Sequence, residues 1–173
     1  MSSRPLHKHP NTLDAHWRFR SRRPDAATLD WIRDPGSLTA RLVARSQGQF
    51  RVRITRLARA RPRLDECRAL GLRTGEWALI REVVLEGCGR PWVVARSVIP
   101  VGTLTGPNRR LARLGTRPLG AFLFRDPGLR RDQVQVVRTP DGHWGRRSRF
   151  LLRGRPLLVA EYFLPALLQE PAS

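Results

Sequence analysis

The hydrophobic pattern of the chain is dominated by two pairs of apolar runs, and a short turn containing glycine separates the two runs of each pair. The first pair covers residues 76–85 and 91–99, and the second covers residues 144–152 and 156–164. Apolar runs rich in β-branched or aromatic residues that flank such a turn are typical of β-hairpins. The pattern therefore predicts two antiparallel hairpins.

Shorter elements are predicted before and between these hairpins. Alternation of apolar and polar residues predicts a strand at residues 50–55, and a basic loop is expected at residues 59–63. Asp25 and Ser37 each precede an apolar stripe of helical spacing, so both can cap a short helix. The remaining expected elements are a turn of helix at residues 65–71, short helices at 108–114 and 119–124, and a strand at 133–137.

Strands grouped as hairpins, with helices early and in the middle of the chain, predict a single α+β domain on an antiparallel sheet. Strand and helix do not alternate, which disfavours a doubly wound parallel sheet. We place this domain at residues 25–173. Residues 1–24 are polar and basic and show no hydrophobic period, so we expect a flexible tail there.

The chain of 173 residues is strongly basic, with a formal charge of +19. Of its 33 basic residues, 32 are arginine, and Lys8 is the one lysine. These cations are spread from Arg4 to Arg155, whereas nucleic-acid-binding proteins tend to gather them in a stripe or a tail. The charge therefore indicates nucleic acid only weakly, and an anionic small molecule would need only a few of these arginines.

The cysteines indicate whether the protein holds a metal or disulfides, and the apolar runs indicate where in the cell it is located. Cys67 and Cys88 have neither the spacing nor the histidine companions of a zinc site, so we expect no metal and no disulfide framework. No signal-peptide core follows the basic N-terminus, and no apolar run is long enough to span a membrane. We therefore expect a cytoplasmic protein.

Two charged residues interrupt otherwise apolar rows of predicted strands. Arg81 shares a strand face with Val83 and Leu85, and Glu161 shares one with Val159. Burying an unpaired ion costs several kcal/mol, so each charge needs a partner. Either the two side chains pair with each other in the core, or one of them lies at a wet edge of the sheet, or the partner of each is a ligand. A ligand with a carboxylate at one end and a hydroxyl at the other would suit both residues.

Other candidate chemistry is weaker. Ser148, His143 and Asp141 could form a nucleophilic arrangement, but no nucleophile-elbow sequence surrounds the serine. The arginines of the 146–149 run alternate between strand faces, so one face is expected to be solvated while the other pairs with an acid or a ligand.

Four motifs stand out in the same segments. They are WALIREVVL at residues 77–85, RSVIP at 96–100 with TLTGP at 103–107, LGTRPLG at 114–120, and WGRRSR at 144–149 followed by residues 156–165. In these motifs the chain resembles the chorismate pyruvate-lyase family, whose enzymes make 4-hydroxybenzoate for ubiquinone. The similarity is close over about half of the chain, and the order and spacing of the motifs are specific.

The resemblance implies an α+β domain whose antiparallel sheet carries helical flaps over an enclosed ligand site. It implies a cofactor-free lyase that converts chorismate to 4-hydroxybenzoate and pyruvate, the first committed step of ubiquinone biosynthesis. Arg81 would bind the ring carboxylate and Glu161 the hydroxyl, and these two residues would be the catalytic pair. The backbone N–H groups of Leu38 and Leu119 would complete the substrate-binding site.

Several points stay open at this level. We place the flaps near Leu38 and at residues 108–124, and a second carboxylate of the substrate could be bound by Arg96 or by an arginine of the 146–149 run. The partners expected are chorismate and 4-hydroxybenzoate, with no nucleic acid, and the protein is expected to be a monomer.

Three alternatives to the lyase are kept. One is a non-catalytic module that binds a small acid, similar to the effector domains of bacterial transcription regulators, although the predicted tail is too short for a helix-turn-helix domain. Another is a nucleic-acid-binding protein, whose affinity would depend steeply on salt. A third is an enzyme that hydrolyses chorismate to a diene-diol with loss of pyruvate.

Overall fold

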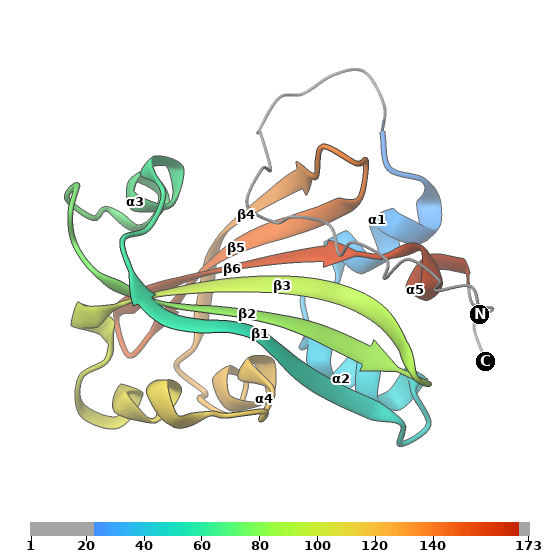
Figure 1. The fold of residues 1–173 in the computed structure, drawn as a ribbon, viewed down its shortest axis with the longest axis horizontal. Coiled ribbons are helices and arrows are strands. Elements are labelled where there is room, and N and C mark those ends of the chain that lie inside the picture. Colours follow the sequence, from blue (N-terminus) through green and yellow to red (C-terminus); the bar gives the residue numbers. More distant parts are fainter. Residues whose placement is uncertain (1–22, 170–173) are drawn as a thin grey trace, which may run out of the picture.

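A computed structural model describes residues 23–169, which form a six-stranded antiparallel sheet and the helices packed on it (Figure 1). The strand order is β1-β2-β3-β6-β5-β4. Residues 1–22 of the predicted tail lie outside the described residues. The strands are β1 (Phe50–Ala60), β2 (Ala78–Gly87), β3 (Arg90–Pro100), β4 (Arg130–Arg138), β5 (Trp144–Leu152) and β6 (Arg155–Phe163), and the helices are α1 (Ala26–Arg33), α2 (Leu38–Arg45), α3 (Leu64–Leu70), α4 (Leu119–Leu123) and α5 (Pro165–Gln169).

Both predicted hairpins are confirmed. β2 pairs with β3, and β5 pairs with β6, in antiparallel register. Cys88 and Gly89 form the first turn with φ values of 51° and 73°, and Arg153 and Gly154 form the second with φ values of 49° and 74°. Two successive left-handed residues give the type of turn whose twist matches the flanking strands, which fixes the register of each pair. The prediction of an α+β fold on an antiparallel sheet is therefore confirmed.

Three predicted elements differ from the structure, two in their bounds and one in its type of helix. The predicted loop at residues 59–63 is wrong in its first part, because β1 continues to Ala60 and pairs with β2 along its whole length. A bulge after Ile54 shifts the alternation there and hides this part of the strand from a search for period two. β4 is longer than predicted, and the segment Gly106–Arg113 forms 3₁₀ turns rather than an α-helix.

Helices cover the two faces of the sheet unequally. In Figure 1, α2, α4 and the 3₁₀ segment lie on one side of the sheet, and α3 lies on the other. The first face holds an apolar cluster that includes Leu79, Leu119 and Val159, and the second holds a smaller one around Leu70 and Ile80. The helices that begin at the predicted caps are confirmed: Asp25 accepts from the Thr28 N–H at 2.7 Å, and Ser37 accepts from the Ala40 N–H at 3.3 Å.

The α3 face carries a buried ionic network. Arg96 donates to both carboxylate oxygens of Glu66, at 2.6 and 2.9 Å, and to Glu82 at 2.6 Å. Two acids satisfy this one guanidinium, so it stays charged in spite of its burial. The network ties α3 to the sheet and lies on the face opposite α2 and α4.

No helix among residues 23–169 is long and apolar enough to cross a membrane.

Gly145→Ala is expected to weaken the fold. An added Cβ would lie 2.2 Å from the backbone oxygen of Glu161 and 2.9 Å from Tyr162 Cδ1, so β5 would have to move away from β6. We expect the free energy of unfolding to fall by about 1–3 kcal/mol, measured by urea denaturation. In Gly102→Ala the new Cβ meets nothing within 4 Å, and its effect should stay within about 0.5 kcal/mol. Equal stability of the two variants would contradict this account of the β5–β6 contact.

Candidate active site

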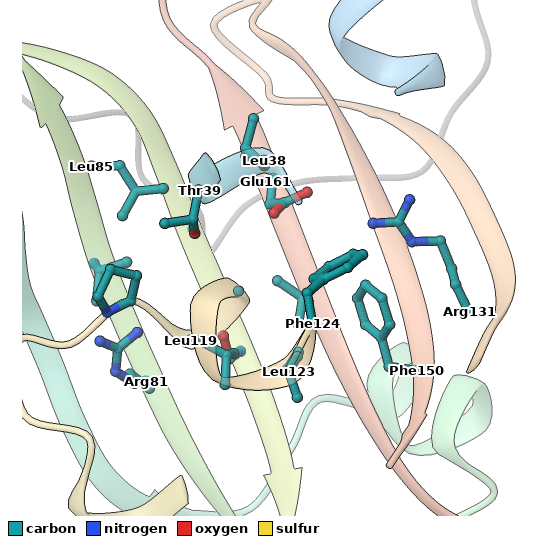
Figure 2. Close-up of a pocket in the computed structure, with 16 residues that line it drawn as sticks. Leu38, Thr39, Arg81, Leu85, Leu119, Leu123, Phe124, Arg131, Phe150 and Glu161 are labelled. Carbon is teal, nitrogen blue, oxygen red and sulfur yellow. The ribbon is translucent and has the colours of Figure 1, made fainter. Parts of the chain in front are cut away.

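A pocket lies between the sheet and the two helices α2 and α4 (Figure 2). About 510 Å³ of space is not filled by protein atoms there, including the solvent at the mouth of the pocket. Aliphatic and aromatic side chains make up most of its wall. The polar side chains that line it are Thr39, Arg81, Ser97, Arg131 and Glu161.

Arg81 stands on β2 and is 2% exposed. Its Nη2 atom donates to the backbone oxygens of Gly115 and Arg117, at 3.1 and 3.0 Å. Burial lowers the pKa of Arg81, and within residues 23–169 no acidic side chain forms an ion pair with it. Because both hydrogen bonds use one nitrogen, the N–H groups of Nε and Nη1 remain as donors for an anion.

Glu161 stands on β6, and its partner is an arginine of the 146–149 run. Arg146 Nε donates to Glu161 Oε2 at 2.7 Å. The same guanidinium, fully buried, donates through Nη1 to the backbone oxygens of Trp31 and Asp34, at 3.3 and 2.6 Å, where α1 ends. Arg146 thus holds the carboxylate in place and joins it to the end of α1. This contact leaves Oε1 of Glu161 for a ligand hydroxyl.

The two charged residues do not pair with each other, so that sequence-based alternative is wrong. Arg81 and Glu161 stand on β2 and β6, and β3 lies between them. Their neighbours on β3 are Ser97 and Ala95, two positions apart. With strands about 4.8 Å apart and about 3.4 Å per residue, the two Cα atoms are about 12 Å apart. Both side chains line the same pocket, from different ends of it.

Leu38 and Leu119 also line the pocket, and each is the first residue of a helix. The first N–H groups of a helix have no acceptor inside it, so these two can serve a ligand. The two helix starts touch at Gly120, where an added Cβ would lie 2.6 Å from Thr39 Oγ1. Absence of a side chain at residue 120 lets α2 and α4 close over the pocket together.

One pocket residue was missed by sequence reasoning. Arg131 of β4 lines the pocket, and its guanidinium carbon lies 4.8 Å from the centre of the Phe150 ring and 5.8 Å from that of Phe124. A bulge follows Arg131, where the register of β4 on β5 shifts before Gln133. The alternation of side chains is broken at that point, so the sequence pattern gave no signal for the face on which this arginine lies.

Other candidates from the sequence lie elsewhere. Arg96 and Arg147 are bound to acids of α3 on the opposite face, and Arg149 pairs with Asp132. Ser148 Oγ is buried and forms no hydrogen bond, so His143 does not activate it. Within residues 23–169, no three His, Cys, Asp or Glu side chains gather in a group that could hold a metal ion.

Solved structures with a similar fold include PhnF and a domain of a bacterial repressor. PhnF from Mycobacterium smegmatis matches 82% of this chain with 69% of its own, at a TM-score of 0.57 and 15% identity. The C-terminal domain of the histidine utilization repressor from Pseudomonas syringae matches 72% of this chain with 97% of its own, at a TM-score of 0.56 and 11% identity. At these identities the likeness concerns the fold.

Curated relatives are far more similar in sequence. A protein of Methylococcus capsulatus named probable chorismate pyruvate-lyase is 46% identical over 158 residues, which cover 83% of this chain and 98% of the relative. A Pseudomonas aeruginosa protein of the same name is 45% identical over 151 residues, which cover 82% and 85%. Residues 15–171 match the family described as chorismate lyase. With this match over most of its length and relatives at such identity, the chain belongs to the chorismate lyase family.

Proposed function

We propose that this protein converts chorismate to 4-hydroxybenzoate and pyruvate, the reaction for which its curated relatives are named and a step toward ubiquinone. One observation carries the proposal to the residues of this chain. A guanidinium and a carboxylate, Arg81 and Glu161, stand at different ends of one largely apolar pocket and do not neutralise each other. A ring with an acid at one end and a hydroxyl at the other matches this arrangement.

In the proposed complex, Arg81 binds the ring carboxylate through Nε or Nη1, the nitrogens that its two backbone contacts leave open. Glu161 accepts a hydrogen bond from the C4 hydroxyl while Arg146 holds its other oxygen. The backbone N–H groups of Leu38 and Leu119 donate to the ligand from the two helix starts above the sheet. These contacts fix the ring in one orientation, and apolar side chains cover its faces.

The reaction is an elimination in which all atoms of chorismate end in the two products. The C3–O bond breaks, and enolpyruvate leaves with the bonding electron pair. The hydrogen at C4 is lost as a proton, its electron pair completes the aromatic ring, and a proton on the methylene carbon of enolpyruvate gives pyruvate. Aromatisation supplies the driving force, so this chain has to hold the reactive conformer and stabilise the developing charge. Glu161 orients the ring through the C4 hydroxyl. The C3–O bond that breaks is next to this hydroxyl, so charged groups at the Glu161 end act on the negative charge that develops there.

The helices α2 and α4 enclose the ring as flaps, in this proposal. They contact each other at Thr39 and Gly120 and both line the pocket. A product sealed in this way leaves only when the flaps open, so product release is expected to limit turnover.

Purified protein incubated with chorismate, without added metal or cofactor, is expected to form 4-hydroxybenzoate and pyruvate in equal amounts. Chromatography of the aromatic product and a coupled assay for pyruvate measure the two. A diene-diol with pyruvate would instead indicate hydrolysis. Tight binding of 4-hydroxybenzoate without any turnover would indicate a binding module like the regulator domains, and either result would overturn the proposal.

Arg81→Met is expected to weaken the binding of 4-hydroxybenzoate by about 10- to 100-fold, because a charge-assisted contact contributes about 1.5–3 kcal/mol. Isothermal titration calorimetry measures the affinity. Arg51→Met removes a cation from an exposed position of β1 and serves as the matched control, with affinity unchanged. A full-affinity Arg81→Met protein would remove this residue from the site.

Glu161→Gln is expected to lower the rate of chorismate turnover by at least about tenfold. The amide carries no charge to balance Arg146, which is 0% exposed, so the stability is expected to fall by about 3–5 kcal/mol at most. Turnover is therefore measured well below the melting temperature of the variant. A folded Glu161→Gln protein that binds product and works at the parental rate would exclude this carboxylate from the mechanism.

Gly120→Ala is expected to open the flaps. The new methyl group would lie 2.6 Å from Thr39 Oγ1 and would push α2 away from α4. We expect 4-hydroxybenzoate to dissociate about tenfold faster or more, measured by stopped-flow fluorescence. Adding Thr39→Ala removes the atom that clashes and should restore slow release. If the double variant releases product as fast as Gly120→Ala, the contact between the two helices does not control the opening.

A further inference from the structure

The wall of the pocket near Glu161 contains a second guanidinium that the site described above does not use. Arg131 Nη1 donates to the backbone oxygen of Asp34 at 3.2 Å, and Arg146 Nη1 donates to the same oxygen at 2.6 Å. Because Arg146 also binds Glu161, this shared oxygen places Arg131 at the Glu161 end of the pocket. Figure 2 shows the Arg131 guanidinium on the Glu161 side, with Arg81 across the pocket.

The acids near Arg131 are already bound by other arginines. Arg146 holds Glu161 at 2.7 Å, and Arg41 holds the Asp34 carboxylate at 3.1 Å. Arg131 itself forms no ion pair with any acid in the part of the chain that the structure describes, and its Nε atom is buried without a hydrogen-bond partner. Its remaining contacts are one backbone oxygen and the faces of Phe150 and Phe124. Arg131 is therefore a cation that is held in place and still has an N–H group, at Nε, without an acceptor.

The connectivity of chorismate says where a second anion must lie. When Arg81 holds the carboxylate at C1 and Glu161 the hydroxyl at C4, the enolpyruvyl ether at the neighbouring carbon, C3, projects from the Glu161 end of the ring. Its carboxylate therefore has to be accommodated at that end. Glu161 alone would repel a carboxylate at that end, whereas an arginine beside it attracts the carboxylate.

We propose that Arg131 binds the carboxylate of the enolpyruvyl group, and that it is the residue by which the site distinguishes substrate from product. The inference rests on the proposed function and names one further contact in the same site. The product, 4-hydroxybenzoate, has lost this carboxylate, so Arg131 contributes to the affinity for chorismate and not to that for the product. The departing group also carries the new negative charge on its oxygen, next to the same cation.

The electrostatics of the free protein fit this role. The pKa of Arg131 is lowered by burial and by the neighbouring charge of Arg146, and the charges of Glu161 and Asp34 offset only part of this effect. A bound carboxylate offsets both effects by placing an anion against the guanidinium. The arginines that the sequence suggested for a second carboxylate are placed differently. Arg96 and Arg147 are held by acids on the other face of the sheet, Arg149 pairs with Asp132, and Arg146 is bound to Glu161 and is not among the residues that line the pocket.

The test compares Arg131→Gln with Arg130→Gln, a neighbouring arginine of β4 that is exposed. For each protein, kcat/KM for chorismate and the Kd of 4-hydroxybenzoate are measured. Arg131→Gln is expected to lower kcat/KM by about 10- to 100-fold, because it removes a charge-assisted contact. The Kd of the product should stay within about twofold of the native value, because the product makes no such contact. Arg130→Gln should change neither quantity.

A purely structural role for Arg131 would weaken both ligands together, and its absence from the site would weaken neither, so either pattern overturns the inference. If Arg131→Gln fails to fold, Arg131→Lys keeps the charge beside the aromatic rings and loses the planar fork. Its kcat/KM for chorismate should then fall by less than that expected for Arg131→Gln, with the Kd of 4-hydroxybenzoate unchanged. If the native protein turns over no chorismate, the proposed function fails, and the Kd of chorismate against that of 4-hydroxybenzoate still decides the role of Arg131.

Discussion

Two opposite charges on one face of the sheet, held too far apart to neutralise each other, are the constraint on which the rest of this structure depends. β3 separates Arg81 from Glu161, so each charge must be stabilised by other groups. Backbone oxygens accept hydrogen bonds from Arg81, and Arg146 donates one to Glu161. Each arrangement satisfies part of the side chain and leaves the rest facing the pocket. A direct pair would have turned the two charges toward each other and left fewer of their hydrogen-bonding atoms for a ligand.

The same polar contacts also determine what covers the pocket. Gly115 and Arg117, which accept from Arg81, immediately precede α4, and the oxygens that accept from Arg146 lie at the end of α1, before α2. The charged residues of the sheet therefore hold the chain segments that lead into both covering helices. In the proposed complex, ligand binding and the position of the flaps would be linked through these arginines, because a movement of either segment changes a contact inside the site.

The sequence predicted the two hairpins and the positions of Arg81 and Glu161, because alternation along a regular strand identifies a charge among apolar neighbours. The groups that bind these two side chains could not be predicted in the same way. Arg146, Arg147 and Arg149 are near neighbours in sequence, and only the pairing of β5 with β6 determines that Arg146 shares the face of Glu161. The bulge beside Arg131 defeats any argument from alternation, and residues 106–113 show an apolar spacing that 3₁₀ turns and helices share. Long-range register, rather than local preference, fixes these features.

The fold by itself does not select catalysis, because a domain of the histidine utilization repressor from Pseudomonas syringae shares it at 11% identity. What has to be explained is how a pocket on such a sheet would favour a reaction over simple retention of an aromatic acid. Contacts that substrate and product share, such as those proposed for Arg81 and Glu161, stabilise both and do not drive turnover. A cation at the Glu161 end acts on the group that is expelled, so its stabilisation is lost when that group departs. The position of Arg131 relative to Glu161 is therefore the feature by which this pocket would act on the group that leaves and not on the ring that stays.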